Sequence, residues 1–234
     1  MIAEKFASGI FEEPRSVLCR VCSRDRDRAQ AFVERMGQGR AGTYEEVLED
    51  PEVDGVYVAL PNHLHAHWSI AALRAGKHVL CEKPIAMNRQ EAEGMFGVAE
   101  ETGKVLIEAY MYPLAPINQQ WIQMALSGRV GRLRTLRVDF AFNRPVLQSD
   151  ARYHPEMGGG ALMDVGCYCL HVMRTVTGVT PVVVVVVIVG EGAAAVAMVV
   201  VVVVVAVAAL IVAAVTVVVV VVVVIVTLTA APAV

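Results

Sequence analysis

The chain has 234 residues, of which 56% are hydrophobic and 18% are charged, and its formal net charge is −3 at pH 7. This length fits one large domain or two small ones, and the weakly acidic balance lacks the basic field of a nucleic-acid-binding protein. An odd count of five cysteines does not suit a small disulfide-rich scaffold and indicates a reducing compartment, so we expect a cytoplasmic protein without a nucleic-acid partner.

The first half of the chain alternates between helix and strand signals. In chain order we expect a helix at 2–10, a strand at 16–22, a helix at 25–36, a short helix after 43, a strand at 54–60, a helix at 65–75, a strand at 77–81, a helix at 88–102 and a strand at 104–108. Thr43 and Glu46 form a capping box, and Gly76 and Gly103 end two of the helices. Strands that alternate with helices of about 10–15 residues predict a parallel sheet with helices on both faces.

The pattern changes near residue 112. We expect a helix at 116–127, a long strand at 133–142 and a helix at 161–176. Alternate residues of the long strand are apolar and share one face: Leu136, Val138, Phe140 and Phe142. A period of two predicts an antiparallel sheet with one open side. We therefore divide the chain into domains 1–112 and 113–234.

The composition changes again after Pro181. The remaining residues are almost all Val and Ala, Glu191 is their only charge, and 193–215 is uninterrupted apolar. This run is long enough to span a membrane, but no Lys or Arg follows it and Val favours strands, so we expect no membrane association. A buried sheet is a second interpretation. A third, which we favour, is that the residues assigned to 182–234 do not represent the natural side chains of underlying strands.

Polar residues follow three predicted strands at their carboxyl ends. The three clusters are Ser23-Arg24-Asp25, Pro61-Asn62-His63 and Glu82-Lys83-Pro84. Ligands of open parallel sheets bind beyond the carboxyl ends of the strands. We therefore expect the three clusters to border one cleft.

Ser23 and Arg24 stand where the second strand of a dinucleotide-binding sheet meets the adenosine ribose. An acidic residue there would bind the ribose 2′-hydroxyl, whereas a hydroxyl followed by Arg suits a 2′-phosphate. This favours NADP over NAD. The alternative is an Arg24 that is ion-paired with Asp25 or Asp27 on the surface.

Lys83 stands between Glu82 and Pro84, and the proline biases its backbone to an extended conformation. A lysine in this place can orient a hydroxyl, and its charge can lower the pKa of a nearby phenol. The alternative is a solvated surface lysine, which the neighbouring polar clusters disfavour.

Asp164, Tyr168 and His171 are spaced i, i+4 and i+7, which places them on one face of the predicted helix. The glycines at 158–160 before this helix would let the backbone come close to a ligand. Lys83 and Tyr168 together could share a proton during hydride transfer at an alcohol carbon. The alternative is a helix that buries Tyr168, with its hydroxyl bonded to Asp164.

Two further patterns have the spacing of metal or redox sites. His63, His65 and His67 have no matching Cys or carboxylate partner, and their side chains would diverge on a helix. Cys19 and Cys22 lie in an apolar run without a second zinc-like pair. We expect no metal at either place.

Three segments resemble the glucose–fructose oxidoreductase (Gfo/Idh/MocA) family. They are Ala-Leu-Pro-Asn-His-Leu-His at 59–65, Ala-Gly-Lys-His-Val-Leu-Cys-Glu-Lys-Pro at 75–84, and Gly-Gly-Gly-Ala-Leu-Met-Asp-Val-Gly-Cys-Tyr at 158–168. The resemblance covers about residues 1–178 and is closest to the branch of xylose dehydrogenase and dimeric dihydrodiol dehydrogenase. It implies a Rossmann domain followed by an α/β domain whose mainly antiparallel open sheet often makes the oligomer contact. We therefore expect a homodimer or homotetramer.

The resemblance also implies roles for individual residues. Lys83 and Tyr168 would handle the proton, and Asp164 would orient a sugar-like substrate. Three residues would line the nicotinamide side: Pro61, Asn62 and His65. The resemblance further places Glu82 at the cofactor and His171 at the substrate.

The chain departs from the family pattern at three places, one of which is the Val/Ala stretch in place of the strands expected after Thr180. The first strand and its Gly-x-Gly-x-x-Gly turn are absent, because residues 1–7 resemble the helix that follows that turn. Pro113 and Ala115 stand where relatives often carry Arg and His, which affects expected substrate contacts. We expect an NADP-dependent oxidoreductase that acts on a sugar or polyol hydroxyl carbon, with NAD as the second choice of cofactor. The alternative is a non-catalytic sugar- or nucleotide-sensing protein, or an inactive fragment, on the same scaffold.

Overall fold

The structure is a computed structural model and describes residues 2–131, 133, 136–143, 150–178, 185–189 and 196–203. It divides into two compact units. The first unit joins Met1–Met111 with Leu147–Asp164, and the second joins Tyr112–Val146 with Val165–Val234. The sequence pattern also changes near residue 112, where we predicted the domain boundary. No pattern in the sequence predicts that 147–164 belongs to the first unit.

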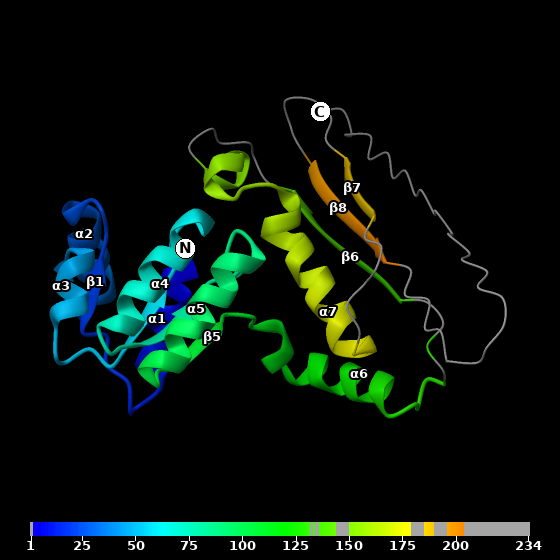
Figure 1. The fold of residues 1–234 in the computed structure, drawn as a ribbon, viewed down its shortest axis with the longest axis horizontal. Coiled ribbons are helices and arrows are strands. Elements are labelled where there is room, and N and C mark those ends of the chain that lie inside the picture. Colours follow the sequence, from blue (N-terminus) through cyan, green and yellow to red (C-terminus); the bar gives the residue numbers. More distant parts are fainter. Residues whose placement is uncertain are drawn as a thin grey trace, which may run out of the picture. The chain divides into compact units, whose positions relative to one another are not determined.

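The first unit consists of short parallel strands and helices (Figure 1). Its elements are α1 (Ile2–Glu12), β1 (Arg20–Cys22), α2 (Arg26–Met36), β2 (Arg40–Gly42), α3 (Tyr44–Glu49), β3 (Gly55–Val58), α4 (His65–Arg74), β4 (His78–Cys81), α5 (Arg89–Thr102) and β5 (Leu106–Glu108). Every ladder in this unit is parallel within the described residues, which confirms the predicted α/β class. The sequence does not predict β2, because Arg-Ala-Gly has no strand pattern and becomes a strand only through pairing with β1.

The parallel strands form two sheets. β1 pairs with β2, and the other sheet has the order β3–β4–β5. In a doubly wound sheet the first strand lies between the second and the fourth. The described strands β1 and β3 share no ladder.

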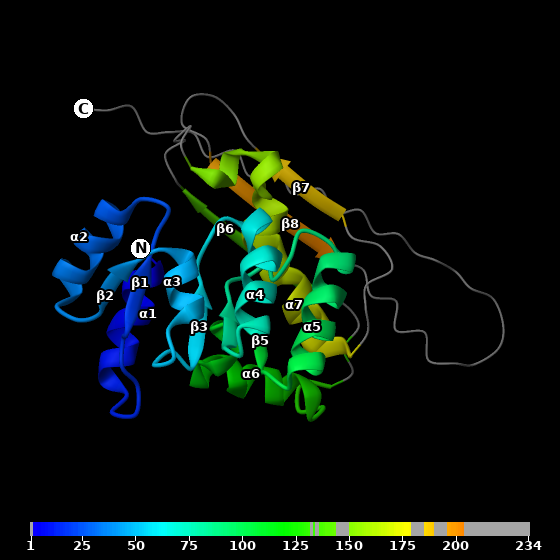
Figure 2. The ribbon, with the colours of Figure 1, turned by 60° about the vertical axis from the view of Figure 1, so that its left-hand side comes forward.

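The core of the first unit lies between the sheet β3–β4–β5 and helices α4 and α5, which run side by side (Figure 2). Leu73 of α4, Met95 of α5 and Cys81 of β4 are fully buried. Burial of one such side chain stabilises the fold by about 1.5–3 kcal/mol. Asn88 caps α5 by accepting a hydrogen bond from the backbone N–H of Glu91 at 2.9 Å, as the sequence predicts.

The strand expected at 54–60 is present as β3, but it is not the buried strand that its apolar sequence predicts. Within β3 only Val58 is buried, while Gly55 is exposed. Val105 and Ile107, next to and in β5, are also half exposed. Successive strand residues point to opposite faces, and α4 and α5 pack on one face of this sheet, so only alternate residues are buried.

The second unit combines two helices with an antiparallel sheet. Its elements are α6 (Pro116–Leu126), β6 (Leu136–Asn143), α7 (Cys167–Thr177), β7 (Val185–Val189) and β8 (Val196–Val203). The sheet order is β6–β8–β7, and all its described ladders are antiparallel, as the two-residue period predicts.

The Val/Ala stretch contains two of these strands. β8 pairs with β6 from Leu136↔Val203 to Asn143↔Val196, so strands do underlie part of 182–234. The rest of that range, and with it the question of side-chain assignment, lies outside the described residues. Among the helices that the structure describes, we find none with the length and apolar character needed to cross a bilayer.

Candidate functional site

A pocket of about 250 Å³ opens in the first unit beyond the carboxyl ends of β3 and β4. Residues 59–62 after β3, Glu82 and Lys83 after β4, and parts of the segment 151–164 line it. Two of the three predicted polar clusters therefore contribute to one pocket. The third cluster, at Ser23, is not among the lining residues that the structure describes.

Lys83 and Asp164 meet in this pocket although 81 residues separate them. The Lys83 ammonium donates to the backbone carbonyl of Asp164 at 2.5 Å and to its carboxylate Oδ1 at 3.1 Å. The two side chains are only 14% and 15% exposed. A partly buried ion pair of this kind fixes the ammonium in place, which excludes the alternative of a solvated surface lysine.

Buried polar groups hold the loop that carries Lys83. His65 is fully buried, with Nδ1 2.8 Å from the carbonyl of Pro84 and Nε2 2.8 Å from the carbonyl of Leu60. Burial lowers the pKa of His65, and the two carbonyls oppose that shift. On the opposite side, the Glu108 carboxylate accepts from the backbone N–H of Ile85 at 2.9 Å. Burial raises the pKa of Glu108.

His65 therefore has a different place from the expected one. Its side chain has no exposed surface with which to contact a nicotinamide, because it lies inside the protein and joins the loop after β3 to the loop after β4. The Lys83–Pro84 peptide bond in the second loop is cis. The pattern of the sequence marks His65 as important but does not reveal that both ring nitrogens face backbone carbonyls.

Glu82 links the same loop to β3. Its carboxylate accepts from the Tyr57 hydroxyl at 2.5 Å and from the backbone N–H of Lys83 at 3.2 Å. Phe6 of α1 stacks on the Tyr57 ring at a centroid distance of 3.9 Å. Sequence reasoning missed Tyr57 and Glu108, although Glu108 ends a strand next to β4, where polar residues were sought.

A glycine turn closes the pocket from the segment 151–164. The side-chain amide of Asn62 donates to the carbonyl of Gly158 at 2.7 Å. Gly158 has φ +76°, and a Cβ there would overlap Met87 and Asn62. A Cβ on Gly159 would lie 2.7 Å from the carbonyl oxygen of Arg152. The close approach that these glycines permit is therefore to the protein's own chain, and Gly158 and Gly159 reach the pocket as part of its wall.

Arg152 is a lining residue that sequence reasoning missed. Its Nε donates to Oδ2 of Asp164 at 2.9 Å, and its Nη1 donates to Asp150 at 3.2 Å. The carboxylate of Asp164 therefore bridges Lys83 and Arg152. The only signal in the sequence is a basic residue a few positions before the glycine run.

Ser23 and Arg24 follow β1 at the start of α2. The Ser23 hydroxyl accepts from the backbone N–H of Asp25 at 3.3 Å, and Asp25 caps α2 by accepting from Asp27 and Arg28. Arg24 is exposed. In the part of the chain that the structure describes, Arg24 forms no ion pair with Asp25 or Asp27, contrary to the alternative interpretation of a surface salt bridge.

Tyr168 and His171 lie on α7 of the second unit. His171 Nδ1 lies 2.6 Å from the Tyr112 hydroxyl, and Tyr168 makes edge contacts with Tyr112 and Phe140 at centroid distances of 6.0 and 5.5 Å. Burial raises the pKa of Tyr112 and lowers that of His171. These aromatic contacts orient the Tyr168 ring within the second unit.

The shared helix face of Asp164, Tyr168 and His171 needs a correction. The helix begins with a π-helical turn over Leu162–Gly166 before the regular α7. The i, i+4 rule assumes 3.6 residues per turn, whereas a π-turn is wider. Asp164 lies inside that turn, so the spacing alone does not place it on the face of Tyr168 and His171.

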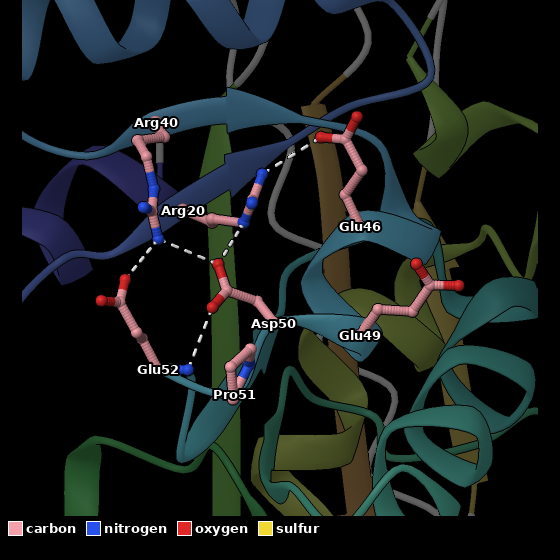
Figure 3. A pocket seen from close by; sticks show the side chains of 7 residues that line it. All are labelled: Arg20, Arg40, Glu46, Glu49, Asp50, Pro51 and Glu52. Atoms are coloured by element: carbon pink, nitrogen blue, oxygen red, sulfur yellow. Dashed lines mark hydrogen bonds and ion pairs between the residues drawn. The ribbon is translucent and has the colours of Figure 1, made fainter.

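A second cluster of charges lies at the amino ends of β1 and β2 (Figure 3). Asp50 accepts from Arg20 Nε at 2.5 Å and from Arg40 at 3.0 Å, and Arg40 also contacts Glu52 at 2.6 Å. Arg20 reaches Glu46 at 3.1 Å. Figure 3 shows the two guanidinium groups pointing at one carboxylate, so the cluster fastens β1, β2 and the end of α3 together.

The three histidines at 63, 65 and 67 have separate surroundings. His63 Nδ1 faces the carbonyl of Met157, His65 is buried, and the His67 ring packs edge-on against Trp68. Within the described residues no three His, Cys, Asp or Glu side chains are grouped so as to hold a metal ion.

Two family models match the chain. The model for the oxidoreductase family with an NAD-binding Rossmann fold matches residues 1–110, and the model for the GFO/IDH/MocA C-terminal domain matches residues 119–224.

Curated relatives and a solved structure are similar to about two thirds to three quarters of this chain. A dTDP-3,4-didehydro-2,6-dideoxy-alpha-D-glucose 3-reductase of Actinomadura kijaniata is 44% identical over 67% of this chain and 47% of its own length. A D-xylose 1-dehydrogenase (NADP(+)) of Haloferax volcanii is 38% identical over 68% of this chain and 49% of its own. The crystal structure of a 3-ketoreductase from Actinomadura kijaniata with NADP and TDP-benzene matches with TM-score 0.67 and 40% identity, over 73% of this chain and 52% of that one. The chain spans about half the length of these relatives.

Proposed function

Because the chain belongs to the Gfo/Idh/MocA family of oxidoreductases, we propose that it serves in NADP-dependent hydride transfer at a hydroxyl-bearing carbon of a sugar or polyol. The observation that carries this proposal is the Lys83–Asp164 pair in a pocket at the carboxyl ends of parallel strands. The predicted xylose dehydrogenase branch agrees with the D-xylose relative.

The residues of the first unit fit a nicotinamide dinucleotide. Pro61, Asn62 and Glu82 line the pocket where such a sheet receives its ligand. Ser23 and Arg24 follow β1, where a ribose 2′-phosphate would find a hydroxyl and an unpaired guanidinium among the described residues. A bound NADP would supply the hydride acceptor or donor.

The remaining chemistry belongs to side chains of this chain. Lys83, held by Asp164, donates a hydrogen bond to the reacting oxygen of the substrate. As a phenolate, Tyr168 takes the hydroxyl proton during oxidation, and as a neutral phenol it returns that proton during reduction. His171 holds a further substrate hydroxyl. General acid–base help of this kind contributes on the order of 10²–10⁴ in rate.

Replacing Lys83 tests the proposal. The Lys83→Met variant should lose about 10²-fold or more of kcat in NADP⁺ reduction with D-xylose or D-glucose, followed at 340 nm. NADPH binding, followed by fluorescence titration, should change little because most of the dinucleotide is held elsewhere. Lys104→Met is the matched control, because Lys104 precedes β5 at the strand end opposite to the pocket. Equal turnover in both variants would remove Lys83 from the mechanism.

A Tyr168→Phe variant tests the proton acceptor. It should lose a comparable part of kcat, and the loss should be smaller at high pH, where hydroxide replaces the missing base. The expected homodimer or homotetramer and the cytoplasmic location stay predictions, and sedimentation of the purified protein would test the first.

A further inference from the structure

The backbone of Arg152 is held by hydrogen bonds at both its N–H and its carbonyl group. It lies in a short 3₁₀ turn, Ala151–Tyr153, where Asp150 accepts from its backbone N–H at 3.1 Å. Its carbonyl accepts from the backbone N–H of Gly160 at 2.8 Å. Gly159 lies so close to the same turn that a Cβ on it would be 2.5 Å from the carbonyl oxygen of Ala151. Arg152 therefore enters the pocket from a fixed backbone.

The guanidinium of Arg152 is shared between the pocket and two carboxylates. Nε donates a hydrogen bond to Asp164 Oδ2 at 2.9 Å, and Nη1 donates one to Asp150 Oδ1 at 3.2 Å. Burial lowers the pKa of Arg152, but the charges of Asp164 and Asp150 raise it more, so its net pKa lies above the ordinary value. Among the contacts of the described residues, Nη2 has no partner. The side chain keeps 45% of its surface exposed while it lines the pocket.

The charged groups at the pocket give it no net positive charge. The cations Lys83 and Arg152 face the anions Glu82 and Asp164, with Asp150 beside them. A phosphate or carboxylate group on the substrate would gain no net attraction from such a set. A neutral ligand with several hydroxyl oxygens fits better, because each charged group can hydrogen-bond an oxygen without leaving a charge uncompensated.

We propose that Arg152 fixes Asp164 opposite Lys83 through Nε, and that its Nη2 donates a hydrogen bond to the substrate oxygen on the carbon next to the reacting one. This rests on the proposed function and narrows its substrate class to neutral compounds with an oxygen on each of two adjacent carbons. Arg152 is thus a positioning residue for Asp164 and a specificity-determining contact for the substrate.

The contact between Arg152 Nη2 and the substrate is tested by changing the protein and the substrate separately and together. The probes are D-glucose and 2-deoxy-D-glucose with NADP⁺, which differ only in the oxygen beside the reacting carbon. Wild-type protein should prefer D-glucose by roughly 10-fold or more in kcat/KM, since the loss of a hydrogen bond to a charged group costs about that factor. In Arg152→Ala the two sugars should differ by less than about 3-fold, because the cycle removes both ends of one contact.

The positioning role has its own readout. Arg152→Ala should also lower kcat for both sugars by roughly 10-fold or more, because Asp164 loses the donor that fixes its second oxygen. Added guanidinium ion at about 10–50 mM should restore part of this kcat but not the preference between sugars. Arg152→Lys should recover little, because an ammonium cannot contact two carboxylates and a hydroxyl in one plane. Arg89→Ala is the matched control, since Arg89 forms one exposed ion pair with Glu93 on α5.

The outcomes separate this inference from the proposed function. If the wild type turns over sugar and Arg152→Ala keeps the preference of the wild type, the inference fails alone. If calorimetry shows that the wild type binds sugar but does not turn it over, the enzyme proposal fails. The preference between the two sugars is then measured as a ratio of binding constants, for the wild type and for Arg152→Ala. If the wild type neither binds nor converts either sugar, both are overturned.

Discussion

Two clusters of arginine and aspartate in the first unit use the same chemistry for different ends. In the cluster at the amino ends of β1 and β2, the Asp50 carboxylate accepts hydrogen bonds from Arg20, from Arg40 and from the backbone N–H of Glu52. In the pocket cluster, the Asp164 carboxylate forms ion pairs with Lys83 and Arg152. The first joins elements that follow one another in the chain, with ion-paired residues at most 30 positions apart. The second joins segments far apart in sequence, and its members line the pocket.

The comparison shows that ion pairing by itself does not identify a functional site. The cluster around Asp50 lines a hollow of about 390 Å³, in which four carboxylates surround two guanidinium groups and each guanidinium contacts two of the carboxylates. A buried carbonyl contact reinforces it, since the Lys77 ammonium donates to the backbone carbonyl of Asp50 at 2.6 Å. This arrangement suits a structural clasp. In the pocket, by contrast, Lys83 and Arg152 lie at the carboxyl ends of the strands, where a sheet of this kind receives its ligand.

The largest expected effect is a loss of activity, without a comparable loss of stability, when Asp164 in the pocket is replaced. Asp164→Asn should lower kcat roughly 10²-fold, because the neutral amide no longer holds the ammonium of Lys83 and the guanidinium of Arg152. The melting temperature should move by no more than about 3 °C. Turnover at 340 nm and thermal unfolding by circular dichroism provide the two readings, and a large fall in melting temperature with intact kcat would reverse the assignment.

Asp50→Asn should show the opposite pattern. Two guanidinium groups lose their shared carboxylate, which costs stability, so we expect the melting temperature to fall by roughly 5 °C or more. The kcat of the folded variant at 15 °C should match the wild type, because Asp50 lies at the other ends of the strands. An unchanged melting temperature would show that the cluster is not a clasp.

The pH dependence sharpens this contrast. The hydrogen bond from Arg20, followed by that from the Glu52 backbone, lowers the pKa of Asp50. A carboxyl whose pKa is lower in the folded state stabilises above its unfolded pKa, about 3.9, and that contribution is lost as the pH falls through the folded pKa. The difference in melting temperature between wild type and Asp50→Asn should therefore be constant from about pH 7 to 5 and shrink below about pH 4. A difference that grows in acid would contradict this sign.

The smallest effect concerns a residue outside both clusters. Thr43 caps α3 in a capping box with Glu46. Thr43→Ala should cost about 1 kcal/mol in the free energy of unfolding, measured by urea denaturation, with no change in kcat. Thr43→Ser retains the oxygen and serves as the control, and an equal loss in both variants would point to packing of the methyl group instead of capping.

The local patterns of the sequence determined much of this protein. Capping residues such as Thr43 and Asn88 and the glycine at 103 set helix ends, because they act on backbone groups within a few residues of themselves. The period of two in β6 predicted an antiparallel sheet, and the polar residues after β3 and β4 predicted the pocket. The Glu-Lys-Pro and glycine-run segments placed Lys83 and Asp164 among the candidates.

Only the tertiary structure decided which of these residues meet and in what state. The salt bridge of Asp164 with Arg152, the burial of His65 between two carbonyls and the π-turn before α7 each depend on backbone paths that no short pattern encodes. The parallel strand β2 exists because β1 lies beside it. A hydrogen bond between distant residues requires the rest of the chain to bring them together, so its partners are set by packing and not by spacing.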